Sequence, residues 1–362
     1  MATPIERVLD LARWAPSGDN TQPWRFEILG PLRCVIHGLD TRERVIYDFR
    51  GFPSHMAHGA LVETAAIAAS TLGMAARIGR RPGTPENHLL FDFELERDAS
   101  ITPHPLVPAI TARVTQRRPM RTDPLTVEDK RGLEQAAGEG YEVLWFEGRA
   151  ARMRVARLLY RSAWIRLRCP EAYPVHREII EWGARFSEDR IPDQALGAGP
   201  VTLKLMRAAL ASWGRVEFLN TWLGGTLAPR LQMDLLPGLL CGAHFLIAAA
   251  RPPESADDFV EGGRAMQRLW LTAAARGLFV QPEMTPLIFS AYVRRGERFT
   301  RAERVWEAAR GVSGRFAALV GPAAAGRSLF LGRIGRGPAP RARSVRLPLE
   351  RLLAPPGRVN GP

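Results

Sequence analysis

Cysteine and lysine are both scarce in this chain of 362 residues. The three cysteines, Cys34, Cys169 and Cys241, lie far apart and form no C-x-x-C pair, which argues against a structural zinc site and against a disulfide framework. Free cysteines suit a reducing compartment, so we expect a cytoplasmic protein. Lysine occurs only at Lys130 and Lys204, so almost every cation is an arginine.

Long apolar runs are also missing. The most continuous one, residues 235–250, is interrupted by Pro237, two glycines and His244, and it is too short to span a bilayer. We expect it to form a buried strand or helix. The chain opens without the charged, apolar and small-residue pattern of a secretory signal. The sequence therefore predicts no membrane partner.

The formal net charge of +13 raises the question of nucleic-acid binding. The preference for arginine over lysine is typical of a GC-rich genome, and the arginines are spread over the whole chain. Their densest stretch, residues 333–351, lies in a segment rich in glycine and proline. We therefore expect a small-molecule substrate and no nucleic-acid partner. With 46% apolar residues, the chain suits one large domain or two ordinary ones with a sizeable core.

Helices and strands alternate in the first hundred residues. Thr3 to Glu6 form a capping box with a proline at the first helical position, and Pro16 follows the helix that they open. Alternating apolar residues after Trp24 predict a strand. The expected elements are a helix at about 4–12, a strand at 24–28, a helix at about 58–72 and a strand at 87–96, followed by a proline-rich joint at 102–108.

The same order of elements begins again after the joint. A helix is expected at 125–137 and a strand at 141–146, and a later helix runs from its cap at Ser255 to Gly277. The stretches Gly59–Gly73 (GALVETAAIAASTLG) and Gly263–Gly277 (GRAMQRLWLTAAARG) have equal length, begin and end with glycine, and hold small residues in their second half. Together these matches indicate an internal duplication.

Residues 149–235 interrupt this second set of elements. They are rich in arginine and in aromatic residues at helical spacing, so we interpret them as a helical insertion. The aromatic side chains are most simply packing residues, and the alternative is that some of them form a lid. The residues concerned are Trp164, Tyr173, Trp182, Phe186, Trp213 and Trp222.

Three polar clusters are candidate binding segments. They are the loop Pro16–Gln22 (PSGDNTQ), the stretch Arg113–Arg118 (RVTQRR) and the stretch Arg341–Arg346 (RARSVR). In an extended backbone Arg113, Thr115 and Arg117 lie on the same side. Two guanidiniums flanking a hydroxyl offer forked donors that suit a phosphate monoester. The alternative for this stretch is a solvated basic loop.

Taken together, the clusters resemble the nitroreductase superfamily of FMN-dependent oxidoreductases. That family has an R-x-S-x-R phosphate motif, a P-S-x-x-N-x-Q-P-W loop and a late arginine before an L-P-L-E-like segment. The matching stretches are Arg113–Arg117 (RVTQR), Pro16–Trp24 (PSGDNTQPW) and Ser344–Glu350 (SVRLPLE). The stretch Gly277–Leu287 (GLFVQPEMTPL) is similar to the segment that lines the flavin ring in the family. Thr115 departs from the family's usual serine.

The order of the motifs departs from the usual one. In the family the phosphate motif precedes the loop, and two chains pair so that each flavin touches the motif of one chain and the loop of the other. Here the first half has the loop and the second half has the phosphate motif. This order resembles the long, internally duplicated Acg-type branch, and it implies a fused dimer with one flavin site. The expected fold is α+β, with two pseudo-symmetric repeats that each contain a mostly antiparallel sheet packed by helices.

The resemblance also implies a division of the chain. The first repeat, residues 1–105, donates the P-S-x-x-N loop. The second, residues 106–362, holds the phosphate motif, the ring-edge segment and the C-terminal arginine, with the helical insertion at about 149–235. Because the dimer is internal in this interpretation, we expect a monomeric pseudo-dimer.

Roles for individual residues follow from the resemblance alone. Four residues would neutralise the FMN phosphate: Arg113, Thr115, Arg117 and Arg346. Three would meet the flavin from the first repeat: Pro16, Ser17 and Asn20. The ring-edge segment would place main-chain donors near N1, O2 and N5 of the flavin; it comprises Gln281, Pro282, Glu283 and Met284 and extends to Thr285. The Glu283 side chain is either a partner of the flavin or a solvated loop carboxylate.

The implied activity is that of an FMN-dependent NAD(P)H oxidoreductase. Hydride would pass from NAD(P)H to the flavin and then to a small acceptor, such as a nitro compound or a quinone, in ping-pong fashion. This chemistry needs no protein nucleophile, so no side chain receives a catalytic role. No metal site is expected either. His55 and His58 have a helical spacing that would suit a metal, but we interpret them as core histidines.

Three alternatives to this activity stay open. The first is a protein that sequesters FMN without turnover, and the second is a flavin-dependent tailoring oxidase of a biosynthetic pathway. The third is a basic interaction protein whose sites are relics. Some relatives accompany adenylating enzymes, so an adenylating enzyme is the candidate protein partner.

Overall fold

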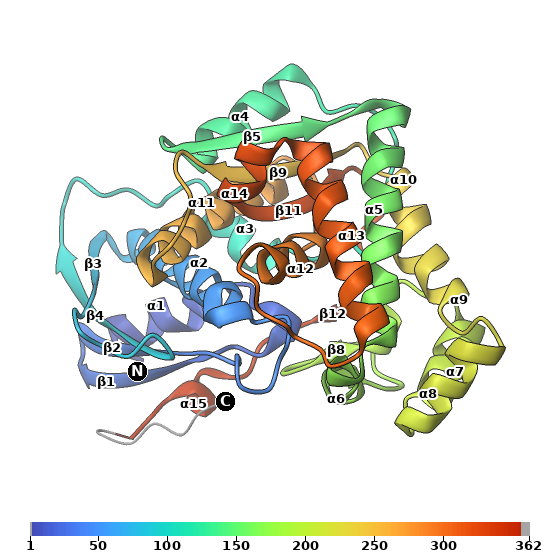
Figure 1. The fold of residues 1–362 in the computed structure, drawn as a ribbon. Helices are drawn as coiled ribbons and strands as arrows, with labels where there is room; N and C mark the ends of the chain where they lie inside the picture. The colour runs from blue at the N-terminus through green and yellow to red at the C-terminus, as the bar shows by residue number, and fades with distance from the viewer. Residues whose placement is uncertain (1, 356–362) are drawn as a thin grey trace.

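A computed structural model describes residues 2–355, and Figure 1 shows its ribbon. The protein belongs to the α+β class, and its two main sheets are four-stranded and antiparallel. Both features were predicted from the sequence. Within residues 2–355, no helix is long and apolar enough to cross a membrane.

The first sheet is built from the first hundred residues. Its strands are β1 (Trp24–Gly30), β2 (Arg33–Leu39), β3 (Met74–Arg80) and β4 (His88–Arg97), in the spatial order β1-β2-β4-β3. Helix α1 (Pro4–Ala12) precedes β1 and opens with the predicted capping box. It buries an apolar face of Ile5, Val8, Leu9 and Ala12. Helix α2 (Phe52–Ala69) connects the second strand to the third.

The second sheet has the same order of strands. Its members are β5 (Tyr141–Phe146), β9 (Ala243–Ala249), β10 (Phe279–Pro282) and β11 (Ser328–Gly335), in the spatial order β5-β9-β11-β10. Counted along the chain, both sheets therefore run first, second, fourth, third. Helix α4 (Val127–Ala137) precedes the first strand, and α11 (Ala256–Ala275) connects the second strand to the third. These positions match those of α1 and α2 in the first half.

Helices α2 and α11 cross at the centre of the molecule through two glycines (Figure 1). A Cβ added at Gly59 would lie 1.8 Å from the carbonyl oxygen of Val260, and one at Gly263 would lie 2.0 Å from that of Met56. Each oxygen belongs to the residue three positions before the glycine of its own helix, so the contact is reciprocal. Only glycine permits helices to approach this closely.

The remaining helices lie around both halves of the molecule and form the insertion. Helix α3 (Val107–Ala112) follows the first sheet, and α5 (Gly148–Arg168) begins the insertion. The insertion continues through α6 (Tyr173–Glu178), α7 (Pro200–Ala209), α8 (Trp213–Trp222), α9 (Leu227–Pro229), a π-helical turn (Arg230–Leu235) and α10 (Leu236–Leu239). The last helices are α12 (Thr285–Arg294), α13 (Glu303–Val320), α14 (Pro322–Arg327) and α15 (Leu349–Leu352). Figure 1 shows α7 and α8 side by side at the edge of the molecule.

Short strands join the insertion to the C-terminal segment. They are β6 (Ile180–Glu181), β7 (Phe186–Ser187), β8 (Ile191–Pro192) and β12 (Arg343–Ser344). Strand β12 pairs with β7, and β6 pairs with β8. The chain then returns to the first sheet, where Leu353 bridges Phe26 and the Ala354 amide donates to the Phe26 carbonyl at 2.9 Å. The returning segment thus covers the edge strand β1, whose main-chain groups would otherwise be unpaired.

Two predictions about the chain need correction. Helix α2 begins at Phe52, six residues before the expected position, because Gly51 takes a positive φ of 75° at the N-cap and Pro53 occupies the first turn. The aromatic side chains of the insertion are not all packing residues. Phe186 is 52% exposed and Trp222 is 74% exposed, so packing does not explain these two.

Candidate functional site

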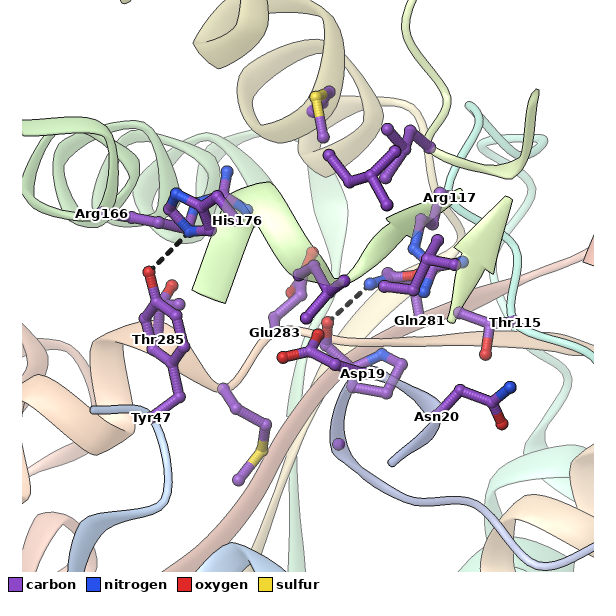
Figure 2. Close-up of a pocket in the computed structure, with 18 of the residues that line it drawn as sticks. Asp19, Asn20, Tyr47, Thr115, Arg117, Arg166, His176, Gln281, Glu283 and Thr285 are labelled. Atoms are coloured by element: carbon purple, nitrogen blue, oxygen red, sulfur yellow. Dashed lines mark hydrogen bonds between the residues drawn. The ribbon is translucent and has the colours of Figure 1, made fainter. Parts of the chain in front are cut away.

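A cavity of about 720 Å³ lies where the first half, the second sheet and the insertion meet. This volume is in the range of small-molecule and cofactor sites. All the residues that the sequence singled out for cofactor binding line it: Pro16, Ser17, Asn20, Arg113, Thr115, Arg117, Gln281, Pro282, Glu283, Met284 and Arg346. They come from segments more than three hundred residues apart in the sequence. Figure 2 shows several of them converging on the cavity from different elements.

The loop before β1 is held in a strained conformation. Asp19, Asn20 and Gln22 have φ values of 49°, 65° and 47°, and Arg50 is the only other non-glycine residue within 2–355 with a positive φ. Such backbone strain concentrates at binding and catalytic sites. The Gln22 amide donates to Ser17 Oγ at 3.0 Å, and Gln22 Oε1 accepts from the Leu347 amide at 3.0 Å. The loop is thereby fastened to the returning C-terminal segment.

The two polar atoms of the Asn20 side chain differ in their surroundings. Its Nδ2 lies within hydrogen-bond distance of three carbonyl oxygens, those of Glu188 (3.0 Å), Arg190 (3.3 Å) and Val345 (3.2 Å). Its Oδ1 is buried and has no hydrogen-bond partner among residues 2–355. A buried polar atom of this kind costs free energy unless something pairs with it. Asn20 therefore offers an acceptor to a ligand in the cavity.

Three arginines form a buried cluster beside the loop. Arg113 and Arg346 are 4% and 8% exposed, and Arg343 is half-buried. Their donors reach only carbonyl oxygens: Arg113 reaches Trp14 O, Arg346 reaches Ala15 O and Val345 O, and Arg343 reaches Thr111 O and Arg113 O. None of the three has a carboxylate within ion-pair distance in the part of the chain that the structure describes.

The pKa values of the clustered arginines reflect the absence of a counter-charge. Burial, together with repulsion from Arg346 and Arg343, holds the pKa of Arg113 well below its usual value. Burial and the charges of Arg343 and Arg13 lower the pKa of Arg346 to about 9. The Nε atoms of Arg113 and Arg343 are buried, and neither has a hydrogen-bond partner in the described part of the chain. Buried charges are ordinarily paired, so this cluster has the properties of a site for an anion.

Arg117 lies apart from this cluster. Burial lowers its pKa to about 10, and the charges that act on it are those of Asp19 and Arg333. Thr115 forms an isolated bridge with Val280 of β10, so the backbone is extended here, as assumed from the sequence. Gln116 points away and donates to Pro338 O at 2.8 Å. Arg113 and Arg117 therefore both face the cavity, but they reach different parts of it.

Glu283 is buried between two cations. Its carboxylate accepts from Arg333 at 2.9 Å and lies 2.6 Å from His244 Nδ1. The other ring nitrogen of His244 lies 2.7 Å from Gly238 O. Both nitrogens face acceptors, so His244 is an imidazolium. Glu283, although buried, raises the pKa of His244 to about 10 against the opposing effect of desolvation. The alternative of a solvated loop carboxylate is wrong for Glu283, since its side chain is 3% exposed.

The main-chain donors of the ring-edge segment differ from those expected. The Glu283 amide donates to Leu331 O at 2.8 Å within the second sheet, so it is not free for a ligand. Helix α12 begins immediately afterwards, with Met284 as its N-cap. The first amides of a helix have no acceptor within the helix, and they carry its partial positive charge. The donors of this segment therefore lie at the start of α12, around Thr285.

Five residues of the cavity were not predicted from the sequence. Arg343 stands three positions before Arg346, and the clustered arginines of RARSVR were the available signal. Nothing in the sequence pointed to Tyr47, Arg166 and His176, because they are scattered over three elements. Asp19 was part of the quoted loop, but no role was assigned to it. All five line the cavity.

The two histidines of α2 lie in the core, as interpreted. His55 Nε2 lies 2.8 Å from Glu86 O, and His58 Nε2 lies 2.9 Å from Pro23 O. Burial lowers the pKa of His58 to about 3 and also lowers that of His55. Both rings are therefore neutral and hold main-chain segments in place.

The Glu283–His244 pair predicts a dependence of stability on pH. The pKa of His244 is raised from 6.5 to about 10 in the folded protein. Its contribution to stability is therefore complete below about 6.5 and is lost as the pH rises towards about 10. We expect the free energy of unfolding, measured by urea titration across this window, to fall less steeply in His244→Gln than in the wild type. His55→Gln is the control, because its pKa shifts in the opposite direction. Identical pH slopes in the wild type and His244→Gln would contradict the prediction.

Comparisons with known proteins give low similarities. No family model matches the chain. An uncharacterized protein of Mycobacterium tuberculosis (strain CDC 1551 / Oshkosh) is 27% identical over 298 residues, which is 79% of this chain and 39% of that protein. The chain thus spans about two fifths of the length of this curated relative.

Two solved structures are also similar to the chain. One is the FMN-dependent nitroreductase NfnB from Mycobacterium smegmatis in complex with NADPH, with a TM-score of 0.37 and 18% identity over 71% of this chain and 98% of the other. The second is a nitroreductase with bound FMN from Desulfitobacterium hafniense DCB-2, with a TM-score of 0.35 and 13% identity over 67% of this chain and 95% of the other.

Proposed function

We propose that this protein is an FMN-dependent oxidoreductase that uses NAD(P)H to reduce a small organic acceptor. The observation that carries the proposal is the buried cluster of Arg113, Arg343 and Arg346, which has no counter-charge in the described chain. A phosphate monoester dianion at the cluster would neutralise it through charge-assisted hydrogen bonds. FMN combines such a phosphate with a flat ring that needs a larger adjoining space, and the cavity supplies that space.

The residues around the cluster fit the phosphate end of FMN. Thr115 and Ser344 line the same cavity and carry hydroxyl groups. Ser17 Oγ accepts from the Gln22 amide, which leaves its proton free to donate to a phosphate oxygen. In this proposal Arg343 joins Arg113 and Arg346 at the phosphate, whereas Arg117 serves the ring.

The other end of the cavity suits a ring that gains negative charge. Arg117 and Arg333 are cations on its wall, and the start of α12 adds main-chain donors. Cations and donors fixed beforehand stabilise an anion without reorganisation. When bound here, FMN would supply the chemistry of hydride transfer between NAD(P)H and an acceptor. The protein's part is to bind the phosphate, to hold the charges of Arg117 and Arg333 near Gln281–Thr285 and to exclude water.

We further propose that the chain is an internally duplicated, fused pseudo-dimer of the Acg type. The identical strand order of the two sheets and the reciprocal contact of Gly59 and Gly263 support this interpretation. The first half supplies the strained loop and the second half supplies Arg113 and Arg117, so a single site results. The pseudo-dimer is monomeric in solution.

The visible absorption spectrum of the freshly purified protein, with the released FMN quantified per chain, tests the proposal. We expect about one FMN per chain and bleaching of the bound flavin on addition of NADH or NADPH. Two FMN per chain would refute the single site. Bound flavin that is not bleached by either nucleotide would indicate sequestration without turnover. A colourless protein that takes up no added FMN would overturn the proposed function.

A further inference from the structure

The cavity extends beyond the arginine cluster into a chamber beneath α7 and α8. Helix α7 lines it with Thr202, Leu205, Met206 and Ala209, and α8 together with its C-cap residue lines it with Val216, Leu219, Asn220 and Leu223. Both sets follow the spacing i, i+3, i+4, i+7, which places them on one face of each helix. Two facing helices thus present mainly apolar stripes to the same space.

The protein itself leaves these stripes incompletely covered. Leu205 is 59% exposed and Leu223 is 65% exposed, although both line the cavity. Contiguous apolar surface of this kind on a soluble protein marks a binding surface. Because the surface is continuous with the cavity, its occupant is a molecule that reaches the candidate redox centre. The chamber therefore suits an acceptor with an apolar body.

A polar group of residues stands where the chamber meets the ring-edge segment. Tyr47 Oη lies 2.8 Å from His176 Nε2, and the two rings stack at 5.9 Å with an angle of 25°. Arg166 is close enough to influence the titration of both residues. Figure 2 shows Tyr47, His176 and Arg166 grouped on one side of the cavity, opposite Arg117 and Thr115. No other part of the proposed function uses these three residues.

The chemistry of this group suits an oxygen atom that gains an electron pair. Burial and Arg166 hold the pKa of His176 at about 3, so its ring is neutral and has a single N–H. With that proton on Nε2, His176 donates to Tyr47 Oη and leaves the phenol O–H free to donate into the cavity. Burial also raises the pKa of Tyr47 well above its usual value, so the phenol keeps its proton until a strong base forms beside it. Arg166, which pairs with Asp234 at 3.2 Å, opposes the effect of burial on the pKa of Tyr47, so it supports the phenolate that proton donation leaves.

We propose that Tyr47 is the proton donor to an oxygen atom of the acceptor, whose apolar body lies against α7 and α8, and that His176 and Arg166 position and support this tyrosine. The inference rests on the proposed function, because the NAD(P)H-reduced FMN supplies the hydride. When hydride adds to a quinone, an electron pair collects on the quinone oxygen. The O–H bond of Tyr47 breaks, an O–H bond forms on the acceptor, and the Tyr47 phenolate recovers a proton from water. The substrate class is thus an apolar carbonyl compound or quinone.

Binding of 2-naphthol tests the chamber without any redox step. This probe has an apolar body and one oxygen, and it is not reducible. We expect calorimetry on the purified protein to show binding that is at least about tenfold weaker in Leu205→Asp, because a carboxylate in the chamber must be desolvated. Val201→Asp is the matched control, since Val201 is also on α7, is 72% exposed and does not line the cavity. Tyr47→Phe removes one hydrogen bond and weakens binding about three- to tenfold. Equal affinities in all variants would overturn the chamber as the acceptor site.

Stopped-flow kinetics of Tyr47→Phe test the proton donor. Reduction of the bound flavin by NAD(P)H is expected to be unchanged, since that step takes no proton from Tyr47. Reoxidation by the quinone menadione is expected to slow about 100-fold. Reoxidation by ferricyanide, which accepts electrons without a proton, is expected to match the wild type. Tyr292→Phe is the control, because the Tyr292 hydroxyl donates to Ile46 O at 3.0 Å and its side chain does not line the cavity.

The outcomes distinguish the proposed role of Tyr47 from the proposed function of the protein. Unchanged menadione reoxidation in Tyr47→Phe, or equal slowing with ferricyanide, would overturn the role of Tyr47 while leaving the flavin proposal intact. A wild-type protein without flavin, or with flavin that NAD(P)H does not bleach, would overturn the proposed function. The 2-naphthol titration would then still report whether the chamber binds apolar molecules.

Discussion

Replacing Gly59 by alanine is expected to destabilise the protein by about 3 kcal/mol or more, at the high end for overpacking in a core. The added Cβ would lie 1.8 Å from the Val260 carbonyl oxygen, and the atom it meets is main chain, which cannot rotate away. Helices α2 and α11 must therefore separate along their whole contact. The free energy of unfolding from urea titration measures the effect. Gly263→Ala is expected to cost a similar amount, because its Cβ would meet the Met56 oxygen at 2.0 Å.

A matched substitution isolates the helix crossing from the general effect of alanine. Gly314 lies in α13, is exposed and has no atom within 4 Å of an added Cβ. Gly314→Ala is expected to stabilise the protein by up to about 1 kcal/mol, since alanine is the better helix former. The double variant Gly59→Ala/Gly263→Ala should cost less than the sum of the two single changes, because the first already separates the helices. Wild-type stability in Gly59→Ala would mean that the helices do not cross at these glycines.

Arg346→Gln is expected to weaken FMN binding about 10- to 150-fold, the effect of losing one hydrogen bond between charged groups. The same change should leave the stability of the FMN-free protein unchanged or higher. The pKa of Arg346 is lowered to about 9, which means that its charge is disfavoured in the folded state and opposes folding at neutral pH. Glutamine removes that charge and can still donate to Ala15 O. Fluorescence titration with FMN and urea unfolding of the FMN-free protein measure the two effects separately.

Arg341→Gln is the control for this prediction. Arg341 lies in the same segment and loses the same charge, but it is exposed and does not line the cavity. FMN affinity should stay within about twofold of the wild type, because an exposed charge is screened by solvent. Arg346→Gln could instead destabilise the FMN-free protein. That result would mean that the Arg346 guanidinium stabilises the fold by joining Ala15 to Val345, and it would contradict an anion-binding role for Arg346.

Local patterns in the sequence were sufficient for several of the elements, although not for β2, β3 and β11, and for most of the binding segments. The capping box at Thr3 and the cap at Ser255 marked true helix starts, alternating residues marked β1 and β4, and a strand was also expected at β5. Each polar cluster was recognised as a group because its residues are neighbours in the chain. Their convergence on one cavity depended on the resemblance to a known family, since periodicity says nothing about which loops meet.

Features that depend on tertiary contacts could not be predicted. Glu283 looked like a loop carboxylate because its partners, His244 and Arg333, come from two other strands. Tyr47 and His176 are 129 positions apart and neither belongs to a motif. The early start of α2 depends on the backbone conformation of Gly51, which its sequence neighbours do not reveal. The close contact of Gly59 and Gly263 was marked only by their matching positions in two similar stretches.

The return of the C-terminal segment to the first sheet has a consequence for how the protein is made. Arg343, Ser344 and Arg346 are the last described residues of the cavity to leave the ribosome, since every other lining residue within 2–355 precedes them. Both sheets and the insertion can be synthesised while the arginine cluster still lacks two of its three members. Charge repulsion among the three arginines therefore begins only after the rest of the protein has been synthesised. If the proposed function holds, a phosphate-bearing ligand binds late, after synthesis of the body of the protein.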